Sequence, residues 1–502
     1  MKTNIKNDDS NKDSLKKQQN MSLQRNLQCY PQKVRMKGVN NNTQALKSGI
    51  AYTFASFLTA GMAFITTPIF TRLMSKASYG AFNNLVSWQS ILTVIFTLNL
   101  GATFISARFD YKDDFDSYVF SMVGLCFTVV IAFLVFINMA GSFAETVFDM
   151  EIAYINLLLI FTMFSQFVSI YQTKEQYNFH YRQSVVIGVV VSVSSSLISV
   201  LLVYIMQDKL LGRVIGYVTP TIMMGIIIVV ILWRKGNIKI TYWKYALPIC
   251  LPYIPHLLSL TLLNSMDRIM IRKIWGEEKT ALYSLAYTCS SVVTILMSSM
   301  NTAYSPWLAR KLEKKEYKGV LKFSYIYISV FLFLVVGILL VAPEVLLILG
   351  GKSYMEAKYV MPPVMMGCAM QLLYTMHVNI EQYKKKTLGM ALASVCAACI
   401  NYILNLWLIP KYGYIAAAYT TWLGYLFLLL AHMFLVWRLK LGRIYNEKFI
   451  LIMVIFGCFM MVLFNKIYES KGIRLILLTA YGMIFLFLLV KNRRKFKEFL
   501  AG

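Results

Sequence analysis

Polar side chains recur at helical spacing inside two long apolar runs of this sequence. Steps of three and four residues, as in Asn83, Ser87 and Ser90 and in Tyr287, Ser291 and Thr294, place each set on one helical face. Because a polar group that faces lipid costs free energy, such faces turn toward a bundle interior or a water-filled cavity. Interhelical hydrogen bonding is one interpretation, and a cavity that binds a hydrophilic molecule is the one we favour. The predicted cavity residues are Asn84, Ser87, Trp88 and Gln89 in the first run and Tyr283, Tyr287, Ser291, Thr294 and Asn301 in the second.

Three arginines lie near the outer ends of the first and seventh apolar runs, on the side that elsewhere carries few basic residues. They are Arg72, Arg268 and Arg272. In one interpretation they extend to the membrane surface, with Asp267 paired to an arginine. In the other they form a cationic patch at the cavity mouth that attracts phosphate and acidic sugar, because arginine presents a bidentate fork. We favour the patch for Arg268 and keep all three as candidate cavity residues.

Three prolines interrupt a single apolar run. Pro248, Pro252 and Pro255 break the helical hydrogen-bond ladder and predict a kinked or hinged helix. His256 follows them directly, and we predict that it lines the cavity or bonds to a freed carbonyl; His377 leaves the same two alternatives.

Motifs for enzymatic chemistry are missing from the sequence. We find no zinc-protease, nucleophile-elbow or paired-carboxylate pattern, and Gly350-Gly351-Lys352-Ser353 has Leu346 where a phosphate-binding loop has glycine. All 23 acidic residues fall in the N-terminal tail, in connections or within about a turn of the end of a run. A cation-coupled drug antiporter holds a carboxylate deep in the bilayer, so this distribution argues against one. We expect no enzyme, no metal and no cofactor.

The composition defines the elements that must position these residues. Of 502 residues, 58% are hydrophobic and 15% charged, against roughly 45–50% and about 25% in soluble domains. This excludes a soluble enzyme, a nucleic-acid-binding domain and a secreted disulfide scaffold, and it predicts an all-α polytopic membrane protein. The net charge of +27 is dispersed between apolar runs, which indicates membrane topology and contact with anionic lipid rather than nucleic acid.

Fourteen apolar stretches are long enough to cross a bilayer at about 20 residues each. If the N-terminal tail is cytoplasmic, 36 of the 50 basic residues lie in the inside segments and 14 lie outside, with none deep in a span. This bias predicts that both termini face the cytoplasm. The predicted spans are 49–71, 82–105, 118–139, 152–172, 184–206, 211–232, 245–266, 280–303, 323–342, 357–380, 388–409, 415–437, 449–465 and 473–490.

An internal repeat relates the two halves of the chain. Arg72 corresponds to Arg268, and Glu175-Gln176-Tyr177 to Glu381-Gln382-Tyr383, at separations of about 200 residues. We therefore predict two pseudo-symmetric six-helix lobes and an added C-terminal helix pair. The predicted divisions are a disordered basic cytoplasmic tail (1–48), an N-lobe (49–232), a C-lobe (233–440), the helix pair (441–490) and a second basic tail (491–502).

With fourteen spans in this arrangement, the chain resembles the polysaccharide flippases of the multidrug/oligosaccharidyl-lipid/polysaccharide (MOP) exporter superfamily. The opening segment SGIAYTFASFLTAGMAFITTPIFTRLMSKASYGAFNNLVSW and the later segment LPICLPYIPHLLSLTLLNSMDRIMIRKIWGEEKTALYSLAY carry the resemblance. It implies a bacterial inner-membrane protein that moves an undecaprenyl-pyrophosphate-linked oligosaccharide to the outer leaflet by alternating access, for capsule, O-antigen or exopolysaccharide assembly. The implied partners are this polyprenyl-linked oligosaccharide, membrane lipids, and polysaccharide polymerase or export machinery.

Two other functions of the same superfamily stay open. One is a lipid II flippase, which we expect to carry more basic residues in the first lobe. The other is a drug or cation antiporter. A membrane-embedded glycosyltransferase or polymerase needs a large catalytic loop, whereas the connections between these spans are short.

Overall fold

The computed structural model describes residues 41–178, 180–439 and 444–491, which are helical throughout apart from short connections. Contacts separate the first fifty residues from a second unit, Ala51–Gly502, and the description below concerns this second unit. Most of both predicted tails lies outside the described residues. Helix α2 begins at Asn41, so the last part of the predicted N-terminal tail is helical.

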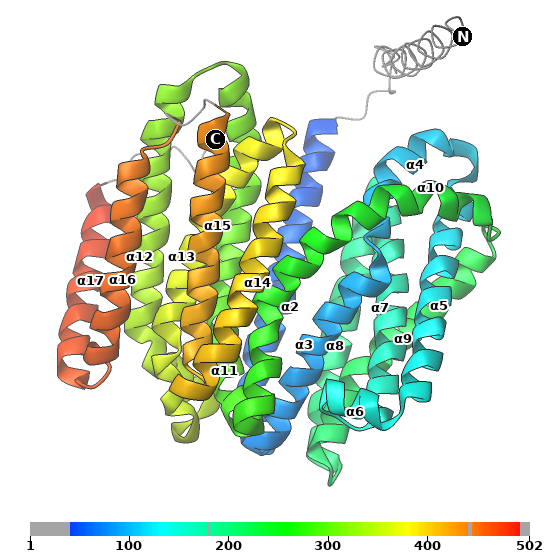
Figure 1. Cartoon of the computed structure of the whole chain (residues 1–502), viewed down its shortest axis with the longest axis horizontal. Helices are drawn as coiled ribbons and strands as arrows, with labels where there is room; N and C mark the ends of the chain where they lie inside the picture. Colours follow the sequence, from blue (N-terminus) through cyan, green and yellow to red (C-terminus); the bar gives the residue numbers. More distant parts are fainter. Residues whose placement is uncertain (1–40, 179, 440–443, 492–502) are drawn as a thin grey trace, which may run out of the picture. The chain divides into compact units, whose positions relative to one another are not determined.

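Each predicted span falls on a helix of the structure (Figure 1). The first six lie on α2 (Asn41–Leu73), α3 (Lys76–Thr97), α5 (Phe115–Ala140), α7 (Ile152–Tyr177), α8 (Tyr181–Ile205) and α9 (Lys209–Trp233). The others lie on α10 (Ile240–Cys250) with α11 (Ile254–Glu313), α12 (Tyr317–Gly350), α13 (Met361–Tyr383), α14 (Thr387–Tyr412), α15 (Ala416–Arg438), α16 (Glu447–Ile467) and α17 (Lys471–Lys491). Short elements connect them: η1 (Leu100–Thr103), α4 (Phe104–Asp110), η2 (Lys112–Asp114), α6 (Ser142–Phe148), η3 (Leu251–Tyr253) and η4 (Lys352–Tyr359).

The long helix α11 contains two predicted spans. Gly276 interrupts it with a φ of 80°, a left-handed conformation that glycine adopts without a Cβ clash. Eleven helical stretches among the described residues are long and apolar enough to cross a membrane, and the stretch Ile240–Glu313 counts once among them. The all-helical membrane fold is thus confirmed, while the number of fourteen crossings stays a prediction.

Two hydrophobic cores hold the helices together. We call α2–α9 the N-lobe and α11–α15 the C-lobe. Most of the N-lobe contributes to one core and the C-lobe, with α16, to the other. Helix α10 lies after the predicted lobe boundary at 233, yet Tyr242, Ala246 and Cys250 pack into the N-lobe core. Their spacing of four residues puts them on one face. Figure 1 shows α10 crossing one end of the bundle that contains α5 and α7.

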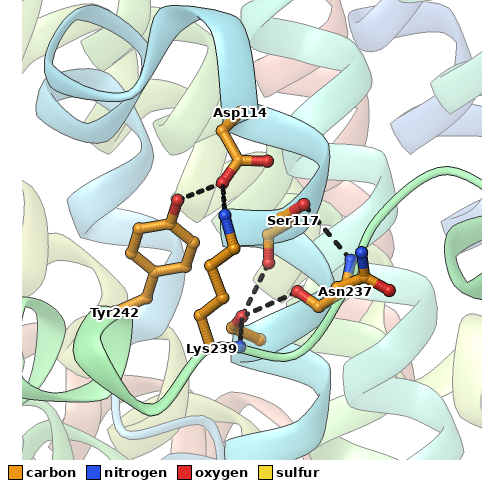
Figure 2. A network of polar contacts seen from close by, with 6 residues as sticks. Asp114, Ser117, Asn237, Lys239 and Tyr242 are labelled. Carbon is orange, nitrogen blue, oxygen red and sulfur yellow. Dashed lines mark hydrogen bonds and ion pairs between the residues drawn. The ribbon is translucent and has the colours of Figure 1, made fainter.

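The connection from α9 to α10 is fastened to the start of α5 (Figure 2). Asp114 accepts hydrogen bonds from the Lys239 ammonium, at 2.5 Å, and from the Tyr242 hydroxyl. The backbone N–H of Asn237 donates to the Ser117 hydroxyl at 3.2 Å. The Asp114 carboxylate raises the pKa of Lys239 above its ordinary value, chiefly through this hydrogen bond. These contacts fix where α10 begins on the N-lobe.

Removing the Asp114 carboxylate is expected to loosen this connection without unfolding the lobe. In Asp114→Ala, backbone amides of residues 236–246 should exchange hydrogen faster, while the unfolding temperature changes little because partly exposed ion pairs contribute about 0–1 kcal/mol. Hydrogen–deuterium exchange followed by mass spectrometry measures this. The matched control is Asp113→Ala at the exposed neighbouring position. Equal exchange in the two variants would contradict the anchoring role.

The two lobes meet along α3 and α11. Gly80 of α3 lies against the backbone of Glu277, so close that a Cβ built on Gly80 would stand 2.0 Å from the Glu277 carbonyl oxygen. Arg272 of α11 forms an ion pair with Asp149, between α6 and α7, at 3.1 Å, and also bonds to Glu277 at 2.9 Å. All of these residues lie at the ends of helices that the charge bias predicts to be outside.

Candidate substrate-binding pockets

A polar pocket of about 420 Å³, open on one side, lies in the N-lobe between α2, α3, α7, α8 and α9. Its wall is rich in hydroxyl and amide groups in a region that is otherwise apolar. The Tyr217 hydroxyl donates a hydrogen bond to the Gln89 carbonyl oxygen at 3.0 Å. The polar lining residues are Thr59, Thr66, Gln89, Ser165, Ser169, Gln172, Ser192, Ser195, Ser196, Ser199, Arg213, Tyr217 and Thr221.

Arg213 is the cation of this pocket. It lies near the start of α9, and its guanidinium carbon stands 3.1 Å from the centre of the Phe70 ring and 4.5 Å from that of Phe82. Its Nε is buried without a hydrogen-bond partner among the described residues. The sequence interpretation placed no basic residue deep in a span. Arg213 is the third residue of a predicted span, close to its end, and the packing of α2 and α3 against α9 places its guanidinium beside two aromatic rings.

The C-lobe holds a second polar pocket, of about 210 Å³, between α11, α13 and α15. It brings together four of the predicted cavity residues: Arg268, Tyr287, Ser291 and Thr294. The Arg268 guanidinium lies over the Tyr287 ring, 4.6 Å from its centre, which is a cation–π contact. The pocket thus combines a cation, an aromatic face and hydroxyl groups.

A buried carboxylate lies directly beside this second pocket. Asp267 has no accessible surface. Its oxygens accept hydrogen bonds from the Tyr283 and Thr421 hydroxyls, both at 2.5 Å, and from the Asn405 amide at 2.7 Å. Asn405 also donates to Asn401 at 3.2 Å. Three helices, α11, α14 and α15, therefore converge on one acidic side chain.

Asp267 lies one residue beyond its predicted span, at a point where the helix does not end. The predicted span stopped at 266, but the helix continues to the break at Gly276, about 13 Å further at 1.5 Å per residue. The alternative in which Asp267 pairs with an arginine is not seen among the described contacts, where hydroxyl and amide donors bond to the carboxylate instead. No group of three or more His, Cys, Asp or Glu able to hold a metal occurs in the described part of the chain.

The other two arginines stand outside both pockets. Arg72 is exposed and donates to the carbonyls of Pro68, at 2.8 Å, and of Ile348, at 3.1 Å. Arg272 is engaged by Asp149 and Glu277 between the lobes. The structure thus brings Arg268 alone of the three to a pocket and uses Arg272 as an interlobe contact.

The rest of the predicted set is distributed over other contacts. Asn84 is buried without a hydrogen-bond partner for its amide among the described residues, and Ser87 donates to the backbone of its own helix. Trp88 packs against Phe148 at a ring distance of 4.5 Å. Asn301 accepts from the Asn379 amide at 2.8 Å. Of these residues, Asn301 fits the interpretation of interhelical hydrogen bonding, because Asn379 belongs to α13, whereas Gln89 lies in the N-lobe pocket.

The proline-rich run is interrupted as the sequence predicts. Helix α10 contains Pro248 and ends at Cys250, η3 contains Pro252, and α11 begins at Ile254 with Pro255 in its first turn. His256 is half-buried there and bonds to the Ser394 hydroxyl at 2.7 Å. His377 is buried in α13 and bonds to the Leu373 carbonyl at 2.9 Å. A hinge function for the prolines stays a prediction.

Sequence reasoning missed most of the N-lobe pocket. The serines at 192, 195, 196 and 199 follow helical spacing within an apolar run. This is the same pattern that predicted polar faces on the second and eighth spans, and it would have identified α8 as part of the pocket.

A third pocket, of about 420 Å³, is apolar and lies between α11 and α14, with Pro255, Met266 and Tyr402 in its wall. Its composition suits a hydrocarbon chain rather than a sugar.

Comparison with known proteins agrees with these features. A family model described as "Polysaccharide biosynthesis protein" matches residues 45–312, and one described as "MatE" matches residues 252–407. The "Lsg locus putative protein 1" of Haemophilus influenzae is 23% identical over 382 residues, which are 72% of this chain and 90% of that protein.

Solved structures share the fold at low sequence identity. A lipid II flippase MurJ in an inward closed conformation has a TM-score of 0.66 and 14% identity, covering 89% of this chain and 100% of that one. A multidrug resistance MATE family transporter of the MOP superfamily, inward-facing, has a TM-score of 0.56 and 12% identity, covering 82% and 96%. The first family model spans more than half of this chain, which therefore belongs to the polysaccharide biosynthesis protein family and is a multi-pass membrane protein with the flippase and transporter fold of the MOP superfamily.

Proposed function

We propose that this protein moves a polyprenyl-pyrophosphate-linked oligosaccharide from the cytoplasmic to the outer leaflet of a bacterial cell membrane. Undecaprenol is the carrier that the resemblance implies, and the product is a precursor of capsule, O-antigen or exopolysaccharide. Both termini then face the cytoplasm, as the distribution of basic residues predicts.

The observation that carries this proposal is a polar pocket with one arginine in each lobe of an apolar helical protein. A sugar chain and a pyrophosphate cannot cross about 30 Å of hydrocarbon unaided, because each unpaired polar group costs several kcal/mol there. Hydroxyl and amide groups replace the water around the sugars. Arg213 and Arg268 supply positive charge, while the polyprenyl chain stays in lipid or in the apolar pocket beside α14.

Movement of the lobes follows from where they touch. The contacts of Gly80 with Glu277 and of Arg272 with Asp149 join the lobes at their predicted outer ends. Opening these contacts and closing the opposite ends would expose the pockets to the other side of the membrane. The break at Pro252, between a helix packed on the N-lobe and one packed in the C-lobe, lies where such a motion needs flexibility.

The test measures flipping in vesicles that contain the purified full-length protein. A fluorescent polyprenyl-pyrophosphate oligosaccharide is placed in both leaflets, and an impermeant quencher reports how much of it reaches the outer leaflet. We expect this lipid to move and lipid II to move much more slowly. Faster movement of lipid II would favour the lipid II flippase, and movement of neither would refute the proposal.

Arg268→Ala is expected to reduce display of surface glycan in cells while the protein level stays unchanged. The substitution removes the cation of the C-lobe pocket and its contact with Tyr287. The matched control is Arg310→Ala, at an exposed arginine of the same helix. Normal display in Arg268→Ala would remove this residue from the substrate site.

One observation also favours coupling of transport to a cation. The enclosed Asp267 carboxylate with its hydroxyl and amide neighbours is a buried acidic group of the kind that an ion-coupled transporter uses. This does not change the proposed substrate. It bears on what drives transport, and the antiporter alternative draws its support from this same residue.

A further inference from the structure

We propose that the N-lobe pocket selects a lipid-linked glycan with an acidic sugar, and that Arg213 binds the sugar carboxylate. This inference rests on the proposed function and narrows its substrate class. It starts from a charge that the protein itself leaves unbalanced. Arg213 lines the pocket, and no hydrogen bond or ion pair joins its side chain to another described residue.

Arg213 is half-buried, and the charged side chains that are fully buried in the described part of the chain have partners. Lys174 pairs with Asp116 at 2.5 Å, Glu381 bonds to His432 at 2.7 Å, and Arg474 pairs with Glu344. Asp267 has its three donors. Because removing a charge from water is expensive unless it is paired, an unpaired guanidinium in a pocket indicates that a ligand supplies the missing anion.

The surroundings of Arg213 favour a planar anion with hydroxyl groups beside it. The rings of Phe70 and Phe82 contact the guanidinium, and its buried Nε has no hydrogen-bond partner among the described residues. The Gln89 carbonyl oxygen accepts from Tyr217, and its amide nitrogen, which makes no hydrogen bond to another described residue, can donate to the ligand. A carboxylate fits the guanidinium fork in a bidentate manner, and the serine hydroxyls suit a sugar ring.

The charge of the pocket argues against the pyrophosphate as its ligand. A pyrophosphate diester brings two negative charges at neutral pH, whereas the pocket wall contains a single arginine and no lysine. A uronic or similar acidic sugar brings one negative charge. The pyrophosphate is therefore assigned to another part of the path, and the carboxylate to Arg213.

Binding of two matched lipid-linked oligosaccharides tests the inference. They differ at one sugar, glucuronic acid in one and glucose in the other, and polyprenyl pyrophosphate without sugar is the third probe. For the full-length wild type in detergent, we expect at least about tenfold tighter binding of the acidic compound, the gain of a charge-assisted hydrogen-bond pair. Arg213→Gln should bind both oligosaccharides equally, and Arg213→Lys should keep part of the preference. Arg182→Gln, at an exposed arginine of the same lobe, should behave as wild type.

The unfolding temperature without ligand separates binding from a structural role. In Arg213→Met an unpaired charge is removed, so we expect the unfolding temperature to stay equal or to rise; a fall would show that Arg213 serves the fold. Equal binding of the acidic and neutral compounds by the wild type would overturn the inference while leaving the proposed flipping intact. Arg213-dependent binding of polyprenyl pyrophosphate alone would reassign the pocket to the carrier. Binding of none of the probes would count against both proposals.

Discussion

Asp267→Ala is expected to destabilise the C-lobe strongly. The substitution leaves the hydroxyls of Tyr283 and Thr421 and the amide of Asn405 without their acceptor inside the protein. Each buried polar group that loses its partner costs about 1–3 kcal/mol. The sum corresponds to a fall in unfolding temperature of about 5 °C or more for a domain of this size. Transport should be lost in the same variant, because α11, α14 and α15 no longer share a common contact.

Thermal unfolding of the purified protein in detergent measures this effect. Asp267→Asn keeps the shape of the side chain and one acceptor oxygen, so its unfolding temperature should lie between those of Asp267→Ala and the wild type. The control is Glu313→Gln, which changes an exposed carboxylate of the same helix. An Asp267→Ala protein as stable as this control would show that the three donors find other partners at no cost.

Gly80→Ala is expected to prevent the two lobes from closing at α3 and α11. The added methyl group would stand 2.0 Å from the Glu277 carbonyl oxygen and 2.8 Å from its carbon. Backbone atoms cannot rotate aside as a side chain does, so the helices must separate. Such overpacking costs about 1–3 kcal/mol or more, which lowers the population of this closed arrangement about tenfold. Flipping should fall with it if the closed arrangement is a step of the cycle.

Hydrogen exchange and the flipping assay together check this prediction. Amides of residues 277–285 should exchange faster in Gly80→Ala, because separation of the helices exposes the start of this part of α11. The control is Gly61→Ala, where no atom lies within 4 Å of the added methyl group. Wild-type exchange and wild-type flipping in Gly80→Ala would mean that the contact between α3 and α11 is not required.

The apolar runs alone determined the class and positions of the helices. A bilayer leaves a backbone no partner for its polar groups except its own helix, so about 20 apolar residues suffice to predict a spanning helix. The interruption around Pro252 was predictable for the same local reason, because proline lacks the N–H that the helix needs. The break at Gly276 could not be predicted in this way. The loop expected between the spans 245–266 and 280–303 is instead part of the long helix α11.

The helical spacing of polar residues predicted the lining of one pocket correctly and failed for most of the predicted residues of α3. Tyr287, Ser291 and Thr294 line the C-lobe pocket, as their shared helical face predicts. Asn84, Ser87 and Trp88 share a face in the same way, yet neighbouring helices cover them and they line neither polar pocket. Spacing along one helix reveals which residues point the same way and does not reveal what the next helix places opposite them.

By itself, the sequence determined that the chain is a helical membrane protein with hydroxyl-rich helix faces, and it predicted two related halves. The tertiary structure decided which charges are enclosed. Arg213 and Asp267 stand near the ends of their predicted spans, where the sequence gives no sign that they are special. The packing of α2 and α3 around one and of α14 and α15 around the other makes them interior groups. The free energy of a charge depends on what surrounds it in three dimensions, and those neighbours come from distant parts of the chain.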